Sequence, residues 1–136
     1  MSAIDVNGIE HTGMLVNNTA LLARWYAELF GATEVSRSES DPPIIFLGFG
    51  GGALLELVPA SEEKWATPTD HVHLCLSVPS LDEAVAAIRE SGTALDRPVF
   101  EAYDGSRVAF FRDPEGNLLQ LVQRVSGSGV HVAVFG

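Results

Sequence analysis

The stretch Gly52-Ala53-Leu54-Leu55-Glu56-Leu57-Val58 occurs a second time, 64 residues further on, as Gly116-Asn117-Leu118-Leu119-Gln120-Leu121-Val122. Five of the seven positions are identical, and residues 44–47 match residues 108–111 at the same offset. Repeats of this period usually belong to stacked repeat proteins, but two copies are too few for a solenoid. The sequence therefore predicts a closed pair of related units.

Each copy is predicted to begin with a strand, over residues 9–16 and 72–78, and to continue with a helix, over residues 19–30 and 81–91. Apolar residues recur at helical spacing within both helical ranges, so both apolar stripes are expected to face the core. Residues that commonly begin and end helices flank the two ranges: Asn18 or Thr19 with Gly31, and Ser80 and Glu83 with Gly92.

Short β-prone runs follow each helix, and turn-forming residues at 48–52 and 113–116 join the last two runs of each copy. Each copy thus reads as βαβββ. The predicted fold is α+β, with two tandem βαβββ modules at residues 8–60 and 70–125 in one domain over residues 1–136. Residues 126–136 are expected to form a tail or an extra edge strand.

The composition indicates a soluble chain of 136 residues, of which 46% are hydrophobic. A single cysteine excludes an internal disulfide, and no secretory signal is recognisable, so a cytoplasmic location is expected. The apolar runs are far shorter than the roughly 20 residues of a membrane-spanning helix. A net charge of −10 repels phosphate backbones, so neither nucleic acid nor a membrane is an expected partner.

Four polar residues occupy matched positions in the two copies. Glu56 interrupts an apolar run, and Gln120 interrupts the matching run at the same place. Burying such a group without a partner costs on the order of 1–3 kcal/mol, so a cation, a hydrogen-bond network or a proton is required. His11 and His73 are matched as well, since residues 9–12 align with residues 71–74 at an offset of 62.

A two-fold axis between the copies would bring these four side chains to one point, an arrangement that apolar packing alone does not require. Two imidazoles, one carboxylate and one amide oxygen suit a single divalent ion of Ni, Co, Zn, Mn or Fe. The predicted metal ligands are therefore His11, Glu56, His73 and Gln120, and a metal-free binding pocket is the alternative.

Other candidates have weaker signals. His71 shares a strand face with His73 and is expected to line the site or the strand edge. Cys75 is expected to be a small buried core residue, without a catalytic role. Trp65 and Tyr103 lie in connecting segments, where aromatic side chains often serve binding, and are candidates for the pocket lining.

Several motifs together resemble the vicinal oxygen chelate superfamily, the group of glyoxalase I, bleomycin-resistance proteins and extradiol dioxygenases. The resemblance covers about residues 8 to 125 and is specific for the fold rather than for the reaction. The motifs that carry it are Ile9-Glu10-His11-Thr12-Gly13, Trp25-Tyr26 with Leu29-Phe30-Gly31, Leu54-Leu55-Glu56-Leu57, His71-Val72-His73-Leu74 and Asp113-Pro114-Glu115-Gly116-Asn117-Leu118-Leu119-Gln120.

The resemblance implies a curved sheet around a metal held by His11, Glu56, His73 and Gln120, often assembled across a homodimer. This set of four residues is similar to the ligand set of bacterial glyoxalase I at three positions, with Gln120 in place of a second glutamate. A lyase or isomerase of the glyoxalase I type is thus expected, with Glu56 as the catalytic carboxylate that moves a proton of a small substrate. Leu15 stands where the glutathione-specific enzyme has an arginine, which argues against glutathione.

Three other activities are compatible with this resemblance. His11, His73 and Glu56 also form a two-His-one-carboxylate triad, as in an Fe(II) extradiol dioxygenase. A bleomycin-resistance-like protein would bind a flat ligand without metal, and an acidic chain suits a cationic one. A fosfomycin-type transferase is less compatible, since Lys64 is the only lysine and arginines are few.

Overall fold

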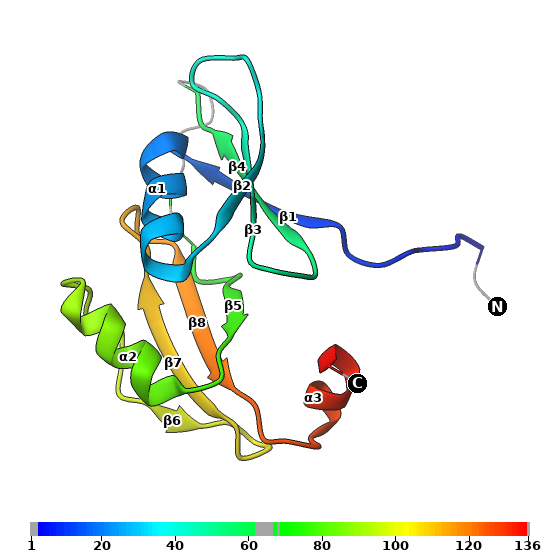
Figure 1. Cartoon of the computed structure of the whole chain (residues 1–136), viewed down its shortest axis with the longest axis vertical. Helices are drawn as coiled ribbons and strands as arrows, with labels where there is room; N and C mark the ends of the chain where they lie inside the picture. Colours follow the sequence, from blue (N-terminus) through cyan, green and yellow to red (C-terminus); the bar gives the residue numbers. More distant parts are fainter. Residues whose placement is uncertain (1–2, 62–66, 68, 136) are drawn as a thin grey trace. The chain divides into compact units, whose positions relative to one another are not determined.

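The computed structural model describes residues 3–61, 67 and 69–135 of the chain. The chain divides into two compact units, Met1–Ala66 and Thr67–Gly136, and each contains one βαβββ arrangement (Figure 1). The predicted α+β fold of two tandem modules is confirmed. No helix within the described ranges has both the length and the hydropathy that crossing a bilayer requires.

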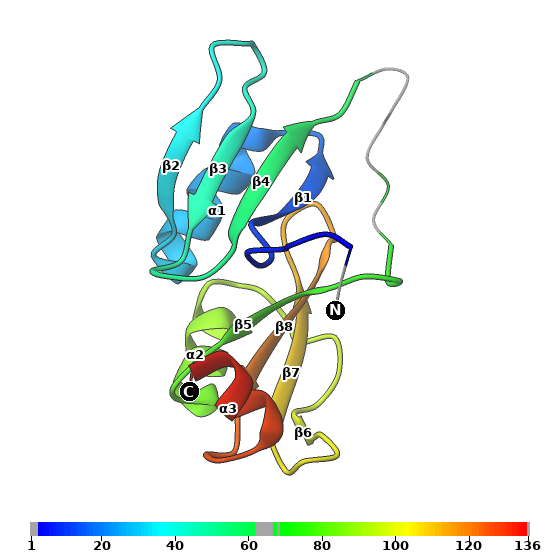
Figure 2. The same ribbon diagram turned by 90° about the vertical axis from the view of Figure 1, so that its right-hand side faces the viewer.

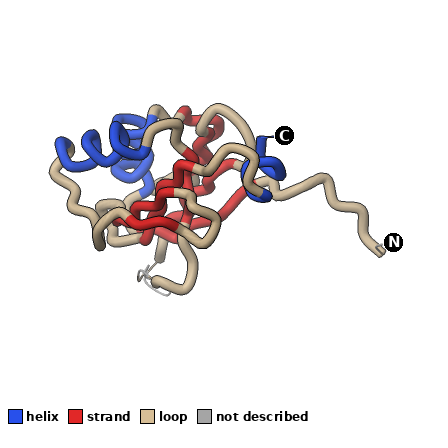
Figure 3. The backbone as a smooth tube through the Cα atoms, turned by 90° about the horizontal axis from the view of Figure 1, so that it is seen from below, coloured by secondary structure: helices blue, strands red, loops and turns tan. Residues whose placement is uncertain are grey.

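The first unit consists of a four-stranded sheet with one helix on it (Figure 2). Strand β1 is parallel to β4, β3 is antiparallel to β4 and to β2, and the sheet order is β1-β4-β3-β2. The elements are β1 His11–Val16, α1 Thr19–Phe30, β2 Thr33–Arg37, β3 Ile45–Gly48 and β4 Leu54–Pro59. Residues 3–10 form an irregular segment that leads into β1 (Figure 3).

Helix α1 has the predicted bounds because both of its ends are capped. The Asn18 side chain accepts a hydrogen bond from the N–H of Leu21, and Gly31 ends the helix in the left-handed region at φ 69°. The buried residues Leu22 and Tyr26 form its inner stripe. This stripe packs on one sheet face, and the other face of the sheet is left for polar side chains.

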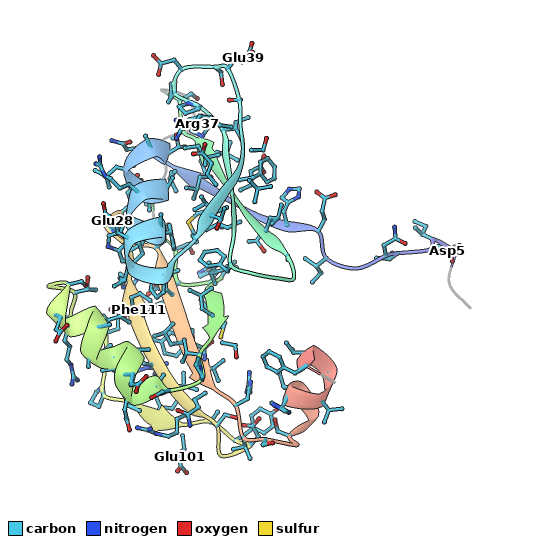
Figure 4. All side chains as sticks on the ribbon, viewed as in Figure 1. Asp5, Glu28, Arg37, Glu39, Glu101 and Phe111 are labelled. Carbon is cyan, nitrogen blue, oxygen red and sulfur yellow. The ribbon has the colours of Figure 1, made fainter. Side chains whose placement is uncertain are left out.

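The second unit has the same topology, with β5 parallel to β8 and the sheet order β5-β8-β7-β6. Its elements are β5 Leu74–Ser77, α2 Leu81–Glu90, β6 Phe100–Glu101, β7 Arg107–Arg112, β8 Leu118–Gln123 and α3 Gly129–Phe135. The Ser80 hydroxyl caps α2 by accepting the N–H of Glu83, as the capping motif predicts. Phe111 lies on the α2 side of β7, and Glu101 points into solvent (Figure 4).

The C-terminal segment forms a helix, so the extra edge strand considered for residues 126–136 is wrong. The hydroxyl of Ser128 accepts a hydrogen bond from the N–H of His131, and its carbonyl accepts one from the N–H of Val132. Ser128 therefore starts α3 in the way that a capping residue starts a helix, which a β-branched run alone does not predict. Helices α2 and α3 lie on opposite sides of β8 (Figures 1 and 2).

Strands β1 and β5 both begin two residues later than predicted. Strand β1 starts at His11, opposite Leu54, and β5 starts at Leu74, opposite Leu119. The partner strand begins after a turn in both cases, and upstream of β1 the pairing ends with the hydrogen bond from the N–H of Leu54 to the carbonyl of Glu10. As a consequence, His71 and His73 precede β5 instead of lying within it.

The predicted turn before β8 is built around a buried carboxylate. Asp113 accepts hydrogen bonds from the N–H groups of Glu115 and Asn117 and from the Asn117 amide, all between 2.9 and 3.0 Å. Gly116 provides the positive φ of 86° that the turn requires. This turn sets the antiparallel register of β7 and β8, which places Gln120 opposite Phe110.

Candidate metal centre

Glu56 lies on the sheet face of the first unit that α1 does not cover. The strand register places it between Gly13 on β1 and Phe46 on β3. The Nε2 atom of His11 is 3.5 Å from the Oε1 atom of Glu56. A Cβ atom at position 13 would lie 3.3 Å from the same oxygen, so glycine leaves room for the carboxylate. Two of the four predicted ligands are thus neighbours in space.

The imidazole of His11 is held from two sides. Its Nδ1 atom is 2.9 Å from Oε1 of Glu10, and its ring stands edge-on to Phe46 at 5.5 Å and 80°. In the tautomer that donates from Nδ1 to Glu10, the lone pair of Nε2 is directed to the Glu56 side. Histidines that bind metals commonly have such a carboxylate behind them.

The predicted burial of Glu56 is only partly correct. Its side chain is 21% exposed, and that of His11 is 37% exposed. An open sheet face remains above the two groups because the helix covers only the opposite face. A carboxylate in this position is accessible enough to contact a metal or a substrate.

The second unit repeats this construction on its own sheet. The His73 ring stands edge-on to Phe110 at 5.5 Å and 82°, nearly the same geometry as that of His11 and Phe46. Phe110 is the register partner of Gln120, and Cys75 is its partner on the other side. Gln120 therefore takes the place of Glu56, and Cys75 takes the place of Gly13.

An ionic cluster fixes the segment that leads to His73. The guanidinium of Arg112 donates hydrogen bonds to both carboxylate oxygens of Asp70, at 2.7 and 3.1 Å. It also donates to both oxygens of Asp96 and to the carbonyl of Gly116. Bidentate pairs of this kind restrict geometry more than single contacts do. Arg112 thus positions residues 70–73, although no strand partner holds them.

The cluster predicts a specific dependence of stability on pH. Hydrogen bonds from Arg112 lower the pKa of Asp70 from its ordinary value. Because the folded-state pKa is the lower one, this carboxylate stabilises the fold at neutral pH, and the contribution is lost as the pH falls below about 4. We expect Arg112→Gln to lower the urea midpoint at neutral pH, with a difference from wild type that shrinks in acid. A difference that does not vary with pH would contradict this assignment.

The remaining candidates are placed as follows. Cys75 is exposed, so its assignment to the core is wrong, and partial desolvation raises the pKa of its thiol. A thiol with a raised pKa is a poor nucleophile at neutral pH, in agreement with a role other than catalysis. His71 is exposed beside the site segment, and Tyr103 is 93% exposed on the turn between β6 and β7. Trp65 and Lys64 lie outside the described residues.

Neither unit alone brings together three His, Cys, Asp or Glu side chains that could hold a metal, as far as the described residues extend. Each unit supplies two of the four predicted ligands, namely one histidine and either a carboxylate or an amide. Three residues that support the histidines, Glu10, Phe46 and Phe110, were not predicted from the sequence. The two phenylalanines were detectable, because they match at the offset of 64 that relates Glu56 to Gln120.

Comparison with known proteins identifies the family. The family model of the Glyoxalase/Bleomycin resistance protein/Dioxygenase superfamily matches residues 8–121. The chain therefore belongs to this superfamily. Among curated proteins, the uncharacterized protein YaeR of Escherichia coli K12 is 27% identical over 123 residues, which cover 85% of this chain and 95% of YaeR.

Solved structures with the same fold have different functions. A superfamily member from Sphaerobacter thermophilus has a TM-score of 0.76 at 20% identity, covering 88% of this chain and 98% of its own. A mutant of glyoxalase I from Zea mays has a TM-score of 0.72 at 23% identity, covering 88% of this chain and 46% of its own. The antibiotic-binding protein TnmS3 from Streptomyces has the same score and identity, covering 92% of this chain and all of its own. These similarities establish the fold.

Proposed function

We propose that the protein is a divalent-metal-dependent enzyme of the glyoxalase I type, which moves a proton next to a carbonyl of a small substrate. The observation that carries the proposal is the duplicated pair in the two modules. In each module a histidine stands edge-on to a phenylalanine, and that phenylalanine pairs in register with Glu56 or Gln120. Apolar packing does not require a carboxylate and an amide at these two positions, whereas a shared ligand does.

The donor set fits a borderline divalent ion such as Ni, Co, Zn, Mn or Fe. It consists of two imidazole nitrogens, one carboxylate oxygen and one amide oxygen. In the described part of the chain, His11 is the one ionic partner of Glu56, and the Glu56 and Gln120 side chains are only partly buried. A ligand can therefore reach an oxygen of each. When bound, the ion would polarise a carbonyl and a neighbouring hydroxyl of the substrate.

In this proposal, each residue of the site has a separate role in the reaction. Glu56 takes a proton from the hydroxyl-bearing carbon next to the carbonyl and returns it to the former carbonyl carbon, while the hydroxyl proton passes to the former carbonyl oxygen. Glu56 has this role because it is the only carboxylate of the four. Gln120 has no titratable group at neutral pH and serves to bind and orient. Glu10 holds the His11 ring in its tautomer. A homodimer is part of the proposal, since a pair from each module is needed and two copies can exchange them.

The first test is the metal content of tag-free protein, measured by elemental analysis beside Glu56→Ala and His73→Ala. About one divalent metal per chain is expected for wild type, and both variants should lose it because each removes one of four ligands. Glu34→Ala, which removes an exposed carboxylate of β2, is the control that should keep the metal. Absence of metal even after reconstitution would refute the enzyme proposal and leave a metal-free binding protein.

A second activity uses the same residues. His11, His73 and Glu56 also form the triad of an Fe(II) dioxygenase that cleaves a catechol ring. The two activities separate in one measurement, because a dioxygenase consumes oxygen and an isomerase works without it. Oxygen uptake by Fe(II)-loaded protein with catechol would therefore favour the dioxygenase.

A further inference from the structure

Arg97 lies over two stacked aromatic rings in the second unit. Its guanidinium carbon is 4.6 Å from the ring centre of Phe100 and 4.6 Å from that of Phe110. The two rings are 6.0 Å apart and inclined by only 14°. A guanidinium held against ring faces keeps its N–H edges directed outward, so cation–π contact orients Arg97 without occupying its donors.

The position of Phe110 links Arg97 to the candidate metal ligands. Phe110 is the register partner of Gln120 and the edge-on neighbour of His73. Alternation along β7 places Phe110 on the sheet face opposite the one that Phe111 turns to α2 (Figure 4). Arg97 thus contacts the same ring, that of Phe110, as His73 does, and Phe110 is paired with Gln120. Arg97 therefore lies close to two of the four proposed ligands, on the open face of the sheet.

Arg97 has no ion-pair partner within the part of the chain that the structure describes. Among the described residues, no carboxylate lies within ion-pair distance of it, and both oxygens of the adjacent Asp96 are engaged by Arg112. Among the described residues, Arg24 and Arg89 also have no such partner, and four arginines do have one: Arg37, Arg107, Arg112 and Arg124. What distinguishes Arg97 from Arg24 and Arg89 is that two aromatic rings orient it beside a candidate ligand. In a chain of net charge −10, an unpaired and oriented guanidinium beside a binding face is suited to a ligand anion.

We propose that Arg97 binds a carboxylate of the substrate, so that the substrate class is small vicinal-oxygen compounds that carry a carboxylate group. This inference rests on the proposed function, because it assumes that the vicinal oxygens bind at the metal ligands. The guanidinium offers two parallel N–H donors, the geometry that a carboxylate accepts.

Two probes that differ in one group test the proposal. Comenic acid and kojic acid share a pyrone ring with a hydroxyl beside a ketone, but comenic acid has a carboxylate where kojic acid has a hydroxymethyl group. We expect calorimetry on metal-loaded protein to show at least about tenfold tighter binding of comenate. Arg97→Gln should abolish this preference without changing the affinity for kojic acid, and Arg97→Lys should keep part of it.

Matched variants separate charge from position. Arg89→Gln removes the same charge from the exposed side of α2 in the same unit and should keep the preference. Phe100→Leu keeps Arg97 but removes one supporting ring, and it should weaken the preference to an intermediate value. A comenate preference that persists in Arg97→Gln, or failure of both probes to bind wild type, would overturn the proposal.

Removal of the metal distinguishes this inference from the proposed function. If binding of kojic acid depends on metal while comenate shows no preference in wild type, the carboxylate site is refuted and the metal enzyme stands. If no metal is bound but comenate still binds in an Arg97-dependent manner, the carboxylate site stands and the proposed function fails.

Discussion

Replacing Glu56 with Gln is expected to lower turnover by about 10²- to 10⁴-fold, the usual contribution of a general base. The amide has nearly the same shape as the carboxylate and still offers one oxygen, but it cannot accept a proton at neutral pH. In the wild type, His11 Nε2 lies 3.5 Å from the Glu56 carboxylate. Because the amide has nearly the same shape, His11 and the rest of the site should keep their positions. The loss should therefore fall on kcat.

The measurement is the conversion of methylglyoxal hemithioacetals formed with a panel of small thiols, with and without a carboxylate, together with exchange of the transferred proton in deuterated water. Metal content is determined on the same samples, because a variant without metal would not isolate the proton transfer. Glu10→Gln is the matched control: it changes a carboxylate that contacts the other nitrogen of His11, and we expect a smaller loss of about 10- to 100-fold. Undiminished kcat in metal-loaded Glu56→Gln would exclude this residue as the base.

Replacing Phe111 with Ala is expected to remove about 3–5 kcal/mol from the free energy of unfolding of the second unit. The Phe111 side chain is fully buried and lies opposite the buried Leu119 on β8, and its backbone also bridges to Leu95. Truncation would leave a cavity between the sheet and α2. Because small domains have only about 5–15 kcal/mol of stability, a large part of this unit's stability would be lost.

Hydrogen exchange and circular dichroism during urea unfolding measure this effect. Tryptophan fluorescence would not, since Trp25 and Trp65 both precede residue 67. Phe110→Ala is the matched control, one residue away on the opposite, half-buried face. It should cost much less stability but should loosen His73 and Arg97, which contact its ring. Equal destabilisation by the two variants would contradict the assignment of faces.

Most of the secondary structure and the duplication of the module followed from local signals and the repeat. Helix α1 has the predicted bounds because Asn18 and Gly31 act within one turn of the chain. The matched turns and the repeat at an offset of 64 predicted the two βαβββ units. The shorter strands β1 and β5 and the helix α3 were not predicted, because they depend on where a partner strand begins and on one capping serine.

The sequence by itself predicted which residues form the candidate site. Glu56 and Gln120 interrupt apolar runs at matched positions, strand alternation places each on one face of its sheet, and two histidines are matched in the same repeat. Only the tertiary structure decided how these groups are supported. The contacts of His11 with Phe46, of His73 with Phe110 and of Arg97 with two stacked rings join residues 3 to 37 positions apart. Such contacts follow from strand register and side-chain rotamers, which no local pattern specifies.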